Sequence, residues 1–224
     1  MMLVRTLEEP SLAEPTLLEG LPGMGFVANI AVLHMIEQLR ARKFAEILIP
    51  SQPAAKILEG HLQIPTVEMY HCHTAEGRDL ILLYGNTQPP DAPSQYGLCS
   101  MVLNTARSLG CGFMICVGGV RGQRRGREVY CAATDAESLN KALGFGVKRI
   151  GGRIFGSTGI LLGLARLWGI RGICLLAETA TPDRPDVEAA KAVLRVIGAM
   201  LRTRIDLSGV EDVVETVRRR AIFG

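Results

Sequence analysis

Residues 19–31 read EGLPGMGFVANIA, and this stretch decides how the rest of the chain is interpreted. An apolar segment, Thr16–Leu18, runs into three glycines and a proline and then into an apolar helical pattern. Because glycine has no Cβ atom, the stretch predicts a tight turn from a strand into a helix over about residues 25–40. Such turns lie at the carboxyl ends of strands, where α/β proteins bind their ligands.

The glycine spacing in this stretch fits neither of the two nucleotide-binding fingerprints. Gly20, Gly23 and Gly25 give GxxGxG rather than GxGxxG, and the Lys-Ser/Thr pair of a Walker A loop is absent. The pattern therefore favours a structural turn that lets the helix pack closely on a sheet over a phosphate site.

Strand and helix patterns alternate along the whole chain. Strands are expected near 44–50, 54–58, 66–73, 79–84, 113–120, 129–133 and 172–179, and helices near 94–109, 136–144, 156–169, 186–204 and 208–220. This alternation predicts one α/β domain over residues 1–224, a sandwich with a mostly parallel central sheet. A hairpin in the first half makes the sheet mixed, and a C-terminal helix with a short tail occupies about residues 208–224.

Composition excludes several classes of protein. With 48% apolar and 21% charged residues, the 224-residue chain can build a substantial core. No apolar run approaches the roughly 18 residues that cross a bilayer, and no signal peptide is recognised, so a cytoplasmic protein without membrane contact is expected. The net charge of +3 gives no argument for nucleic acid, and six cysteines without a CxxC pair suit buried, reduced thiols.

Two further positions at predicted strand ends are candidates for binding chemistry. The run VGGVRGQRRGR, residues 117–127, could hold an anion on its amides and arginines, although a solvated basic loop is the favoured interpretation. Glu178 ends an apolar strand and could act as a general base, bind a ribose or accept bonds from neighbouring loops. The candidate ligand pocket consists of Gly23, Gly25, Gly119, Arg121 and Glu178.

The remaining polar motifs favour structural roles. Ser157 or Thr158 is expected to cap the helix that starts at Gly156, since no GxSxG elbow surrounds them. His71 and His73 share one face of a strand and leave a zinc site two ligands short, so no metal is expected. His34 is expected to be a packed histidine. No catalytic set can be assembled, so the sequence predicts neither an enzyme nor a cofactor.

In the order of its motifs the chain resembles the archaeal branch of the proteasome assembly chaperone family. The resemblance rests on GLPGMGFVANIAVLHMIEQL (20–39), on the strand ending at Gly118-Gly119 and on FGSTGILLGLARLWGIRGICLLAET (155–179). It covers about Leu17 to Asp206, and Leu21 stands where the family usually has an aromatic or other apolar residue. It implies a three-layer α/β/α sandwich similar to nucleoside phosphorylases, without established catalysis. It also implies a homo-oligomer that binds proteasome α-subunits and assists or monitors assembly of the core particle.

Some archaeal members of that family end in a hydrophobic–tyrosine–any tripeptide that inserts between α-subunits. This chain ends in Ile222, Phe223 and Gly224, similar to that tripeptide with phenylalanine in the tyrosine position. Arg218, Arg219 and Arg220 would add attraction to an acidic rim. The structural alternative is a frayed helix end whose apolar residues fold back on the core.

Two other functions stay open at this point. One is a small-molecule binder or enzyme on a phosphorylase-like sheet, with a nucleoside, phosphate or ATP as ligand. It predicts a deep polar pocket where the first glycine-rich turn, Arg121 and Glu178 converge. The other is an anion- or nucleic-acid-binding module built on residues 121–127, whose binding would weaken with salt.

Overall fold

A computed structural model describes residues 2–49, 55–58, 60–122 and 128–221. Its strands are β1 (Leu3–Thr6), β2 (Thr16–Gly20), β3 (Arg42–Leu48), β4 (Lys56–Leu58), β5 (His61–Gln63), β6 (Thr66–His73), β7 (Asp79–Gly85), β8 (Phe113–Arg121), β9 (Val129–Ala133), β10 (Lys148–Arg149) and β11 (Arg171–Thr179). Its helices are α1 (Val27–Gln38), α2 (Ala92–Ser108), α3 (Ala136–Leu143), α4 (Gly156–Ala165), α5 (Val187–Leu201) and α6 (Val210–Ala221), with 3₁₀ turns at Met24–Phe26 and Arg166–Trp168.

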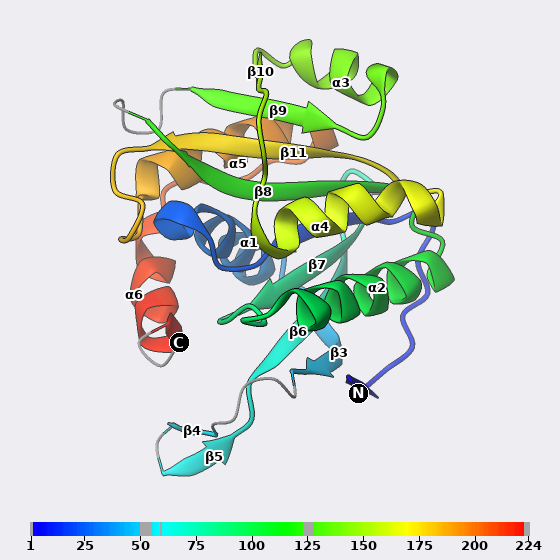
Figure 1. Ribbon diagram of the computed structural model, residues 1–224, viewed down its shortest axis with the longest axis vertical. Helices are drawn as coiled ribbons and strands as arrows, with labels where there is room; N and C mark the ends of the chain where they lie inside the picture. The colour runs from blue at the N-terminus through cyan, green and yellow to red at the C-terminus, as the bar shows by residue number, and fades with distance from the viewer. Residues whose placement is uncertain (1, 50–54, 59, 123–127, 222–224) are drawn as a thin grey trace.

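A nine-stranded mixed sheet forms the middle layer (Figure 1). The strand order is β1-β3-β6-β7-β2-β8-β11-β9-β10. The four central strands, β7, β2, β8 and β11, run parallel. The neighbouring pairs β1–β3, β3–β6 and β6–β7 are antiparallel, and β9 pairs antiparallel with β11. Nearly continuous apolar runs in β7, β8 and β11 suit strands that are buried on both faces.

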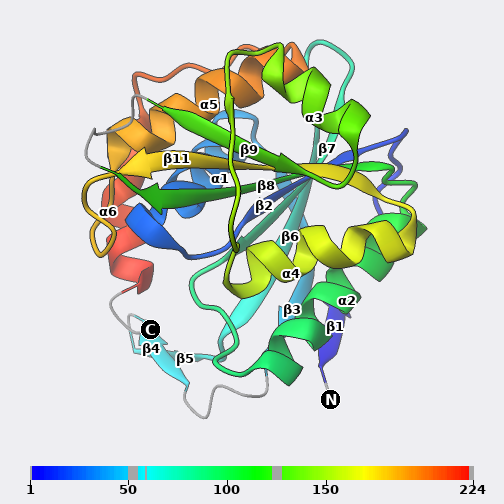
Figure 2. The ribbon, with the colours of Figure 1, turned by 45° about the horizontal axis from the view of Figure 1, so that its top comes forward.

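Helices cover both faces of the sheet. One apolar cluster joins α1, α3, α5 and α6 to one face, and a second joins α2 and α4 to the other. Figure 2 shows α5 and α3 on the opposite side of the strands from α4 and α2. The predicted three-layer α/β/α sandwich with a mixed, mostly parallel central sheet is therefore confirmed, while its likeness to nucleoside phosphorylases stays a prediction.

The glycine-rich turn after β2 is shaped by two contacts that only glycine permits. A Cβ atom on Gly20 would lie 2.4 Å from Cβ of Val32, so α1 packs directly on the end of β2. Gly25 has a φ of +66°; its N–H donates to the Pro182 carbonyl over 2.7 Å, and its carbonyl accepts from the Asp186 amide over 2.8 Å. The interpretation of this stretch as a turn that brings the helix close to the sheet agrees with this packing.

The structure tests the predictions made for the cysteines, for His34 and for the short strands. The six cysteines are buried free thiols and His34 is buried, as predicted. The ring Nε2 of His34 is also bonded to the Asp206 carbonyl. Strands β1, β5 and β10 were not expected, because each is short and β1 is exposed along its whole length. Over the described residues, no helix combines the length and apolar character that spanning a membrane requires.

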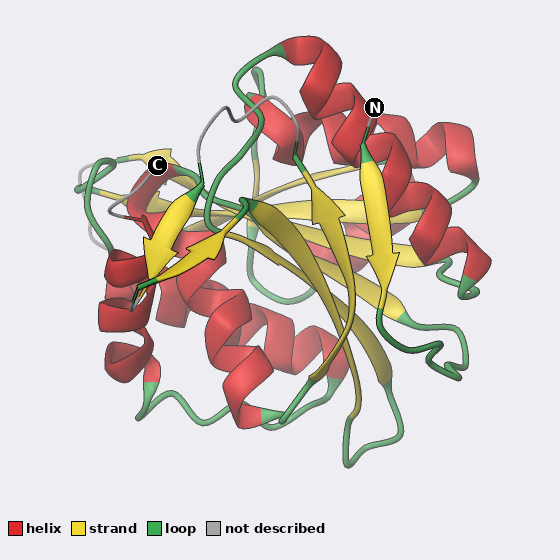
Figure 3. Cartoon of the chain, turned by 90° about the horizontal axis from the view of Figure 1, so that it is seen from below, coloured by secondary structure: helices red, strands yellow, loops and turns green. Residues whose placement is uncertain are grey.

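Strands β4 and β5 form a separate hairpin that extends away from the main sheet at the bottom of Figure 1, and Figure 3 shows it from below. The sequence predicts a strand at residues 54–58, of which the structure describes Lys56–Leu58 as strand, while residue 54 lies outside the described part. Ile57 and Leu62 on this hairpin are 65% and 75% exposed. The hairpin therefore contributes apolar surface rather than core.

Candidate functional site

A cavity of about 580 Å³ lies at the carboxyl ends of β2, β8 and β11. Its wall comes from the turn at Pro22–Met24, the end of β8, the loop 150–155 and the start of α4. Figure 1 shows the chain from β10 crossing the front of β9, β11 and β8 before it enters α4. This is the edge of an open parallel sheet where α/β proteins usually place ligands.

The structure brings together only part of the predicted ligand pocket. Gly23, Gly119 and Arg121 line the cavity. Gly25 is turned toward Thr179 and Asp186, and Glu178 lies against Gly122, where a Cβ atom would be 1.8 Å from Glu178 Cγ. Neither Gly25 nor Glu178 is part of the lining, which is mostly apolar.

Glu19 is fully buried in β2 behind the cavity. One carboxylate oxygen accepts from the Leu21 amide over 2.9 Å and from the Thr158 hydroxyl over 3.3 Å, and the other accepts from the Val117 amide over 3.3 Å. Burial raises the pKa of Glu19 to about 7, although these three bonds oppose the shift. Glu19 therefore joins the ends of β2, β8 and α4 and can change its charge near neutral pH.

Three thiols lie around this carboxyl group. Burial, followed by the negative charge of Glu19, raises the pKa of Cys99, Cys116 and Cys174. Such thiols stay protonated and are poor nucleophiles. They pack the sheet rather than supply chemistry.

The predicted cap of α4 is wrong. The N-cap residue is Phe155, which has no capping side chain. The Thr158 hydroxyl is bonded to Glu19, and the Ser157 Oγ has no partner in the described part of the chain. The helix end is instead held by Gln88, whose side-chain oxygen accepts from the Ser157 amide over 3.0 Å. By contrast, Asp135 caps α3 by accepting from the Ser138 amide over 2.8 Å.

The histidines of β6 are each engaged by a carboxylate. His71 Nε2 is bonded to Glu8, and His73 Nδ1 is bonded to Asp79 over 2.6 Å. Their rings lie on one face of the strand with centroids 6.2 Å apart, as expected, while Cys72 packs into the opposite apolar cluster. Within the described residues, no three His, Cys, Asp or Glu side chains gather into a set that could hold a metal ion.

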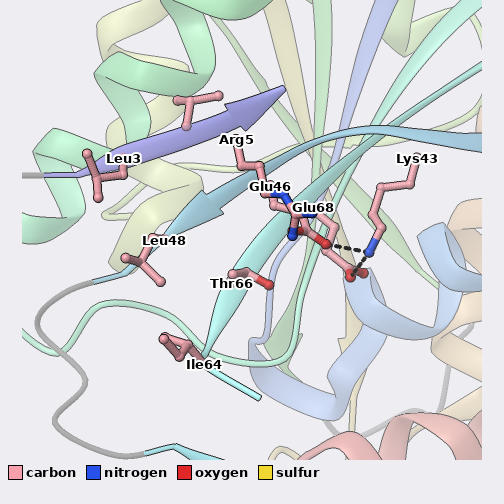
Figure 4. Close-up of a pocket in the computed structure, with 9 residues that line it drawn as sticks. Leu3, Arg5, Lys43, Glu46, Leu48, Ile64, Thr66 and Glu68 are labelled. Carbon is pink, nitrogen blue, oxygen red and sulfur yellow. Dashed lines mark hydrogen bonds and ion pairs between the residues drawn. The ribbon is translucent and has the colours of Figure 1, made fainter. Parts of the chain in front are cut away.

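A second hollow, of about 750 Å³, lies on the open face of β1, β3 and β6 (Figure 4). Lys43 lines this hollow and contacts Glu46 over 2.6 Å and Glu68 over 2.9 Å, and Arg5 contacts Glu46 over 3.6 Å. The charged side chains of the hollow are therefore paired within the chain. The rest of its lining includes Leu3, Leu48 and Ile64. This hollow lies near one edge of the sheet, on a part of its surface that the described helices leave uncovered. The described side chains that line it form no catalytic group.

Arg218 is the one predicted protein-binding residue whose side chain the structure describes, and it lies near the end of α6. Val210, Val213, Val214 and Val217 are buried and fix the helix against the core, and Arg218 is exposed. Acidic residues in the first turn of α6 suit the positive end of the helix dipole. The side chains of Arg219 and Arg220, and the tail Ile222, Phe223 and Gly224, lie outside the described part of the structure.

Sequence reasoning missed Glu19, Gln88 and the loop 150–155 as parts of this region. An acidic residue directly after the apolar Leu17 and Leu18 is the one signal that pointed to Glu19. Gln88 and the loop carry no such signal, because they reach the cavity only through the fold.

Comparisons with known proteins identify the family of this fold. The model of the PAC2 family matches residues 17–221. The uncharacterized protein MJ1210 of Methanocaldococcus jannaschii is 30% identical over 216 residues, which is 91% of this chain and 83% of that protein. The crystal structure of Pyrococcus furiosus PbaB, an archaeal proteasome activator, matches with a TM-score of 0.87 at 28% identity over 100% of this chain and 99% of that one.

A second Pyrococcus furiosus structure, PbaA, has a TM-score of 0.80 at 24% identity over 99% of this chain and 97% of that one. PbaA is described as an archaeal homolog of proteasome-assembly chaperone, and at this identity the likeness shows the fold alone. The family match and the relative from Methanocaldococcus jannaschii both extend over most of the chain. The chain therefore belongs to the PAC2 family.

Proposed function

We propose that this chain is a non-enzymatic partner of the proteasome that binds α-subunits and assists or monitors assembly of the core particle. The observation that carries the proposal is its likeness to the proteasome activator PbaB over the full length of both chains. The proposal includes a homo-oligomer in an archaeal cytoplasm, without a cofactor. Co-purification with proteasome α-subunits tests it.

The geometry supports a binding role for the C-terminal end. The buried valines of α6 hold this helix against α1 and α5, so the position of its C-terminal end relative to the core is fixed. Arg218 is exposed there, and Arg219 and Arg220 follow in sequence. A cationic helix end next to an apolar tail suits a partner with an acidic rim around an apolar slot.

A related role, activation of an assembled core particle, is favoured by one specific observation. PbaB, the activator, is 28% identical to this chain, whereas PbaA is 24% identical. Both roles require contact with α-subunits, but only activation changes peptide hydrolysis. Hydrolysis of a fluorogenic peptide by the purified core particle, with and without this chain, distinguishes them.

Deletion of Ile222–Gly224 is expected to weaken binding to the assembled core particle roughly thirtyfold, about 2 kcal/mol, because an aromatic anchor is lost. Phe223→Ala is expected to have most of this effect. Phe223→Tyr serves as the matched variant and is expected to bind at least as tightly, since it keeps the ring and adds a hydroxyl group. Surface plasmon resonance on immobilised core particle measures all three, and unchanged affinity of the deletion would remove the tail from the proposal.

A further inference from the structure

The cavity at the strand ends has the volume and the apolar wall that are typical of a ligand site. The proposed function does not involve this cavity. Its volume of about 580 Å³ lies within the range of small-molecule pockets, roughly 300–1,000 Å³. Val120, Leu176 and Ile154, which belong to the apolar cluster on the α2 and α4 face, supply an apolar wall. A ligand that fills this space must therefore carry a substantial apolar part.

The charged groups that line the cavity are cationic. Arg121 and Arg153 line it and are both exposed to solvent. Neither forms an ion pair with any side chain that the structure describes, and the lining contains no acidic residue within the same part of the chain. Two unpaired guanidinium groups beside an apolar wall favour an anionic head group, and arginine binds carboxylates in bidentate geometry.

Gly23 gives independent support for open space at this place. Its φ of −163° is extended backbone that any residue adopts, and no atom lies within 4 Å of a Cβ atom built on it. In this it differs from Gly20 and Gly25, which a close contact and a positive φ restrict to glycine. Because Gly23 is part of the lining, we expect a large side chain at this position to reach the cavity without disturbing the turn.

The inner end of the cavity offers a charged head group less than the rim does. The hydroxyl of Thr158, which is part of the lining, already donates to the buried Glu19 and is not free to donate to a ligand. The arginines lie at the exposed rim. The head group is expected at Arg121 and Arg153, with the apolar part directed inward along Leu176.

We propose that this cavity binds a small amphipathic carboxylate, a free carboxylic acid with an aliphatic or aromatic tail. The binding is independent of contact with the proteasome, so loss of either property leaves the other intact. No covalent step is involved.

Three probes with one tail and different head groups test the proposal on the full chain: octanoate, octan-1-ol and octylamine. Titrations followed by calorimetry at neutral pH are expected to give at least about tenfold tighter binding of octanoate than of octan-1-ol, because of the charge-assisted bonds. Octylamine is expected to bind most weakly. Equal affinities for the three probes, or no binding of octanoate, would overturn the proposal.

Two sets of variants locate the site. The double variant Arg121→Gln/Arg153→Gln is expected to lower octanoate affinity about tenfold and leave octan-1-ol unchanged. Arg149→Gln, an exposed arginine outside the lining, is the control and should change neither. If the double variant binds octanoate as the parent chain does, the assigned head-group site is wrong.

Gly23→Leu is expected to fill the cavity and abolish binding of both octanoate and octan-1-ol. Its control is Gly112→Leu, at the opposite end of β8, where a Cβ atom also meets nothing within 4 Å. Thermal melting shows whether the variants fold. A folded Gly23→Leu chain that keeps octanoate affinity contradicts the proposal, and if this variant does not fold, the arginine variants decide.

Discussion

Stability of this protein is expected to fall as the pH rises from about 5 to 8, and Glu19→Gln is expected to remove most of that loss. The carboxyl group of Glu19 is fully buried, and its pKa rises from 4.5 to about 7 in the folded chain. The folded state therefore holds this proton more tightly than the unfolded state. The resulting stability is fully present below the unfolded pKa and is lost as the pH rises through about 7.

The difference in the pH dependence of stability between the parent chain and Glu19→Gln is large enough to measure. A pKa shift of this size corresponds to about 2 to 3 kcal/mol between pH 5 and 8. Glutamine is neutral at every pH and has the same size, so the free energies of unfolding of parent and variant should diverge by this amount over the interval. Groups whose pKa is lowered in the folded chain, such as Asp135 and Asp206, act in the opposite direction and at more acidic pH.

Guanidinium denaturation at four pH values between 5 and 8 provides the comparison. Glu37→Gln is the matched control, because Glu37 is an exposed carboxylate on α1. It should follow the parent chain at every pH. Parallel curves for the parent and Glu19→Gln would show that Glu19 is not the buried acid described above.

Gly119→Ala is expected to destabilise the protein by about 3 kcal/mol. A Cβ atom at this position would lie 2.3 Å from the Met24 carbonyl oxygen and 3.0 Å from the Met24 carbonyl carbon. These are backbone atoms, and the turn that carries them is held by the bonds of Gly25 to Pro182 and Asp186. The turn cannot withdraw as a flexible side chain would, so the strain of overpacking stays in the folded state.

Gly112→Ala is the control for this prediction. It lies just before β8, where a Cβ atom meets nothing within 4 Å. Because alanine also restricts the unfolded chain, Gly112→Ala is expected to be neutral or to stabilise by up to about 1 kcal/mol. Urea denaturation measures both variants, and equal stability of the two would contradict the close contact between β8 and the turn.

The parts of the fold that follow from local patterns could be predicted from the sequence. The apolar runs of β7, β8 and β11 indicated these strands, and the glycine-rich stretch at residues 20–25 indicated the turn before α1. Strand β1 could not be found this way, since it is exposed along its length and exists through its antiparallel pairing with β3. Strand β10 has only two residues and depends in the same way on β9.

The candidate site was predicted less completely, because it is built from segments far apart in the sequence. Glu19 is bonded to Val117 and Thr158, which are 98 and 139 residues away, so its burial is a property of the tertiary structure. Gly25 lies in the predicted turn but faces Thr179 rather than the cavity, because its positive φ redirects the chain. The α4 cap was misassigned for a related reason: Gln88, 69 residues away, replaces a local cap.

The most direct test of the proposed function is binding of the intact chain to purified proteasome α-subunits, followed by sedimentation velocity. We expect a new, faster-sedimenting species that contains both proteins, and its amount should fall when Ile222–Gly224 are deleted. Separate boundaries for the two proteins at all concentrations tested, both for free α-subunits and for the assembled core particle, would contradict the assignment of this chain as a proteasome partner.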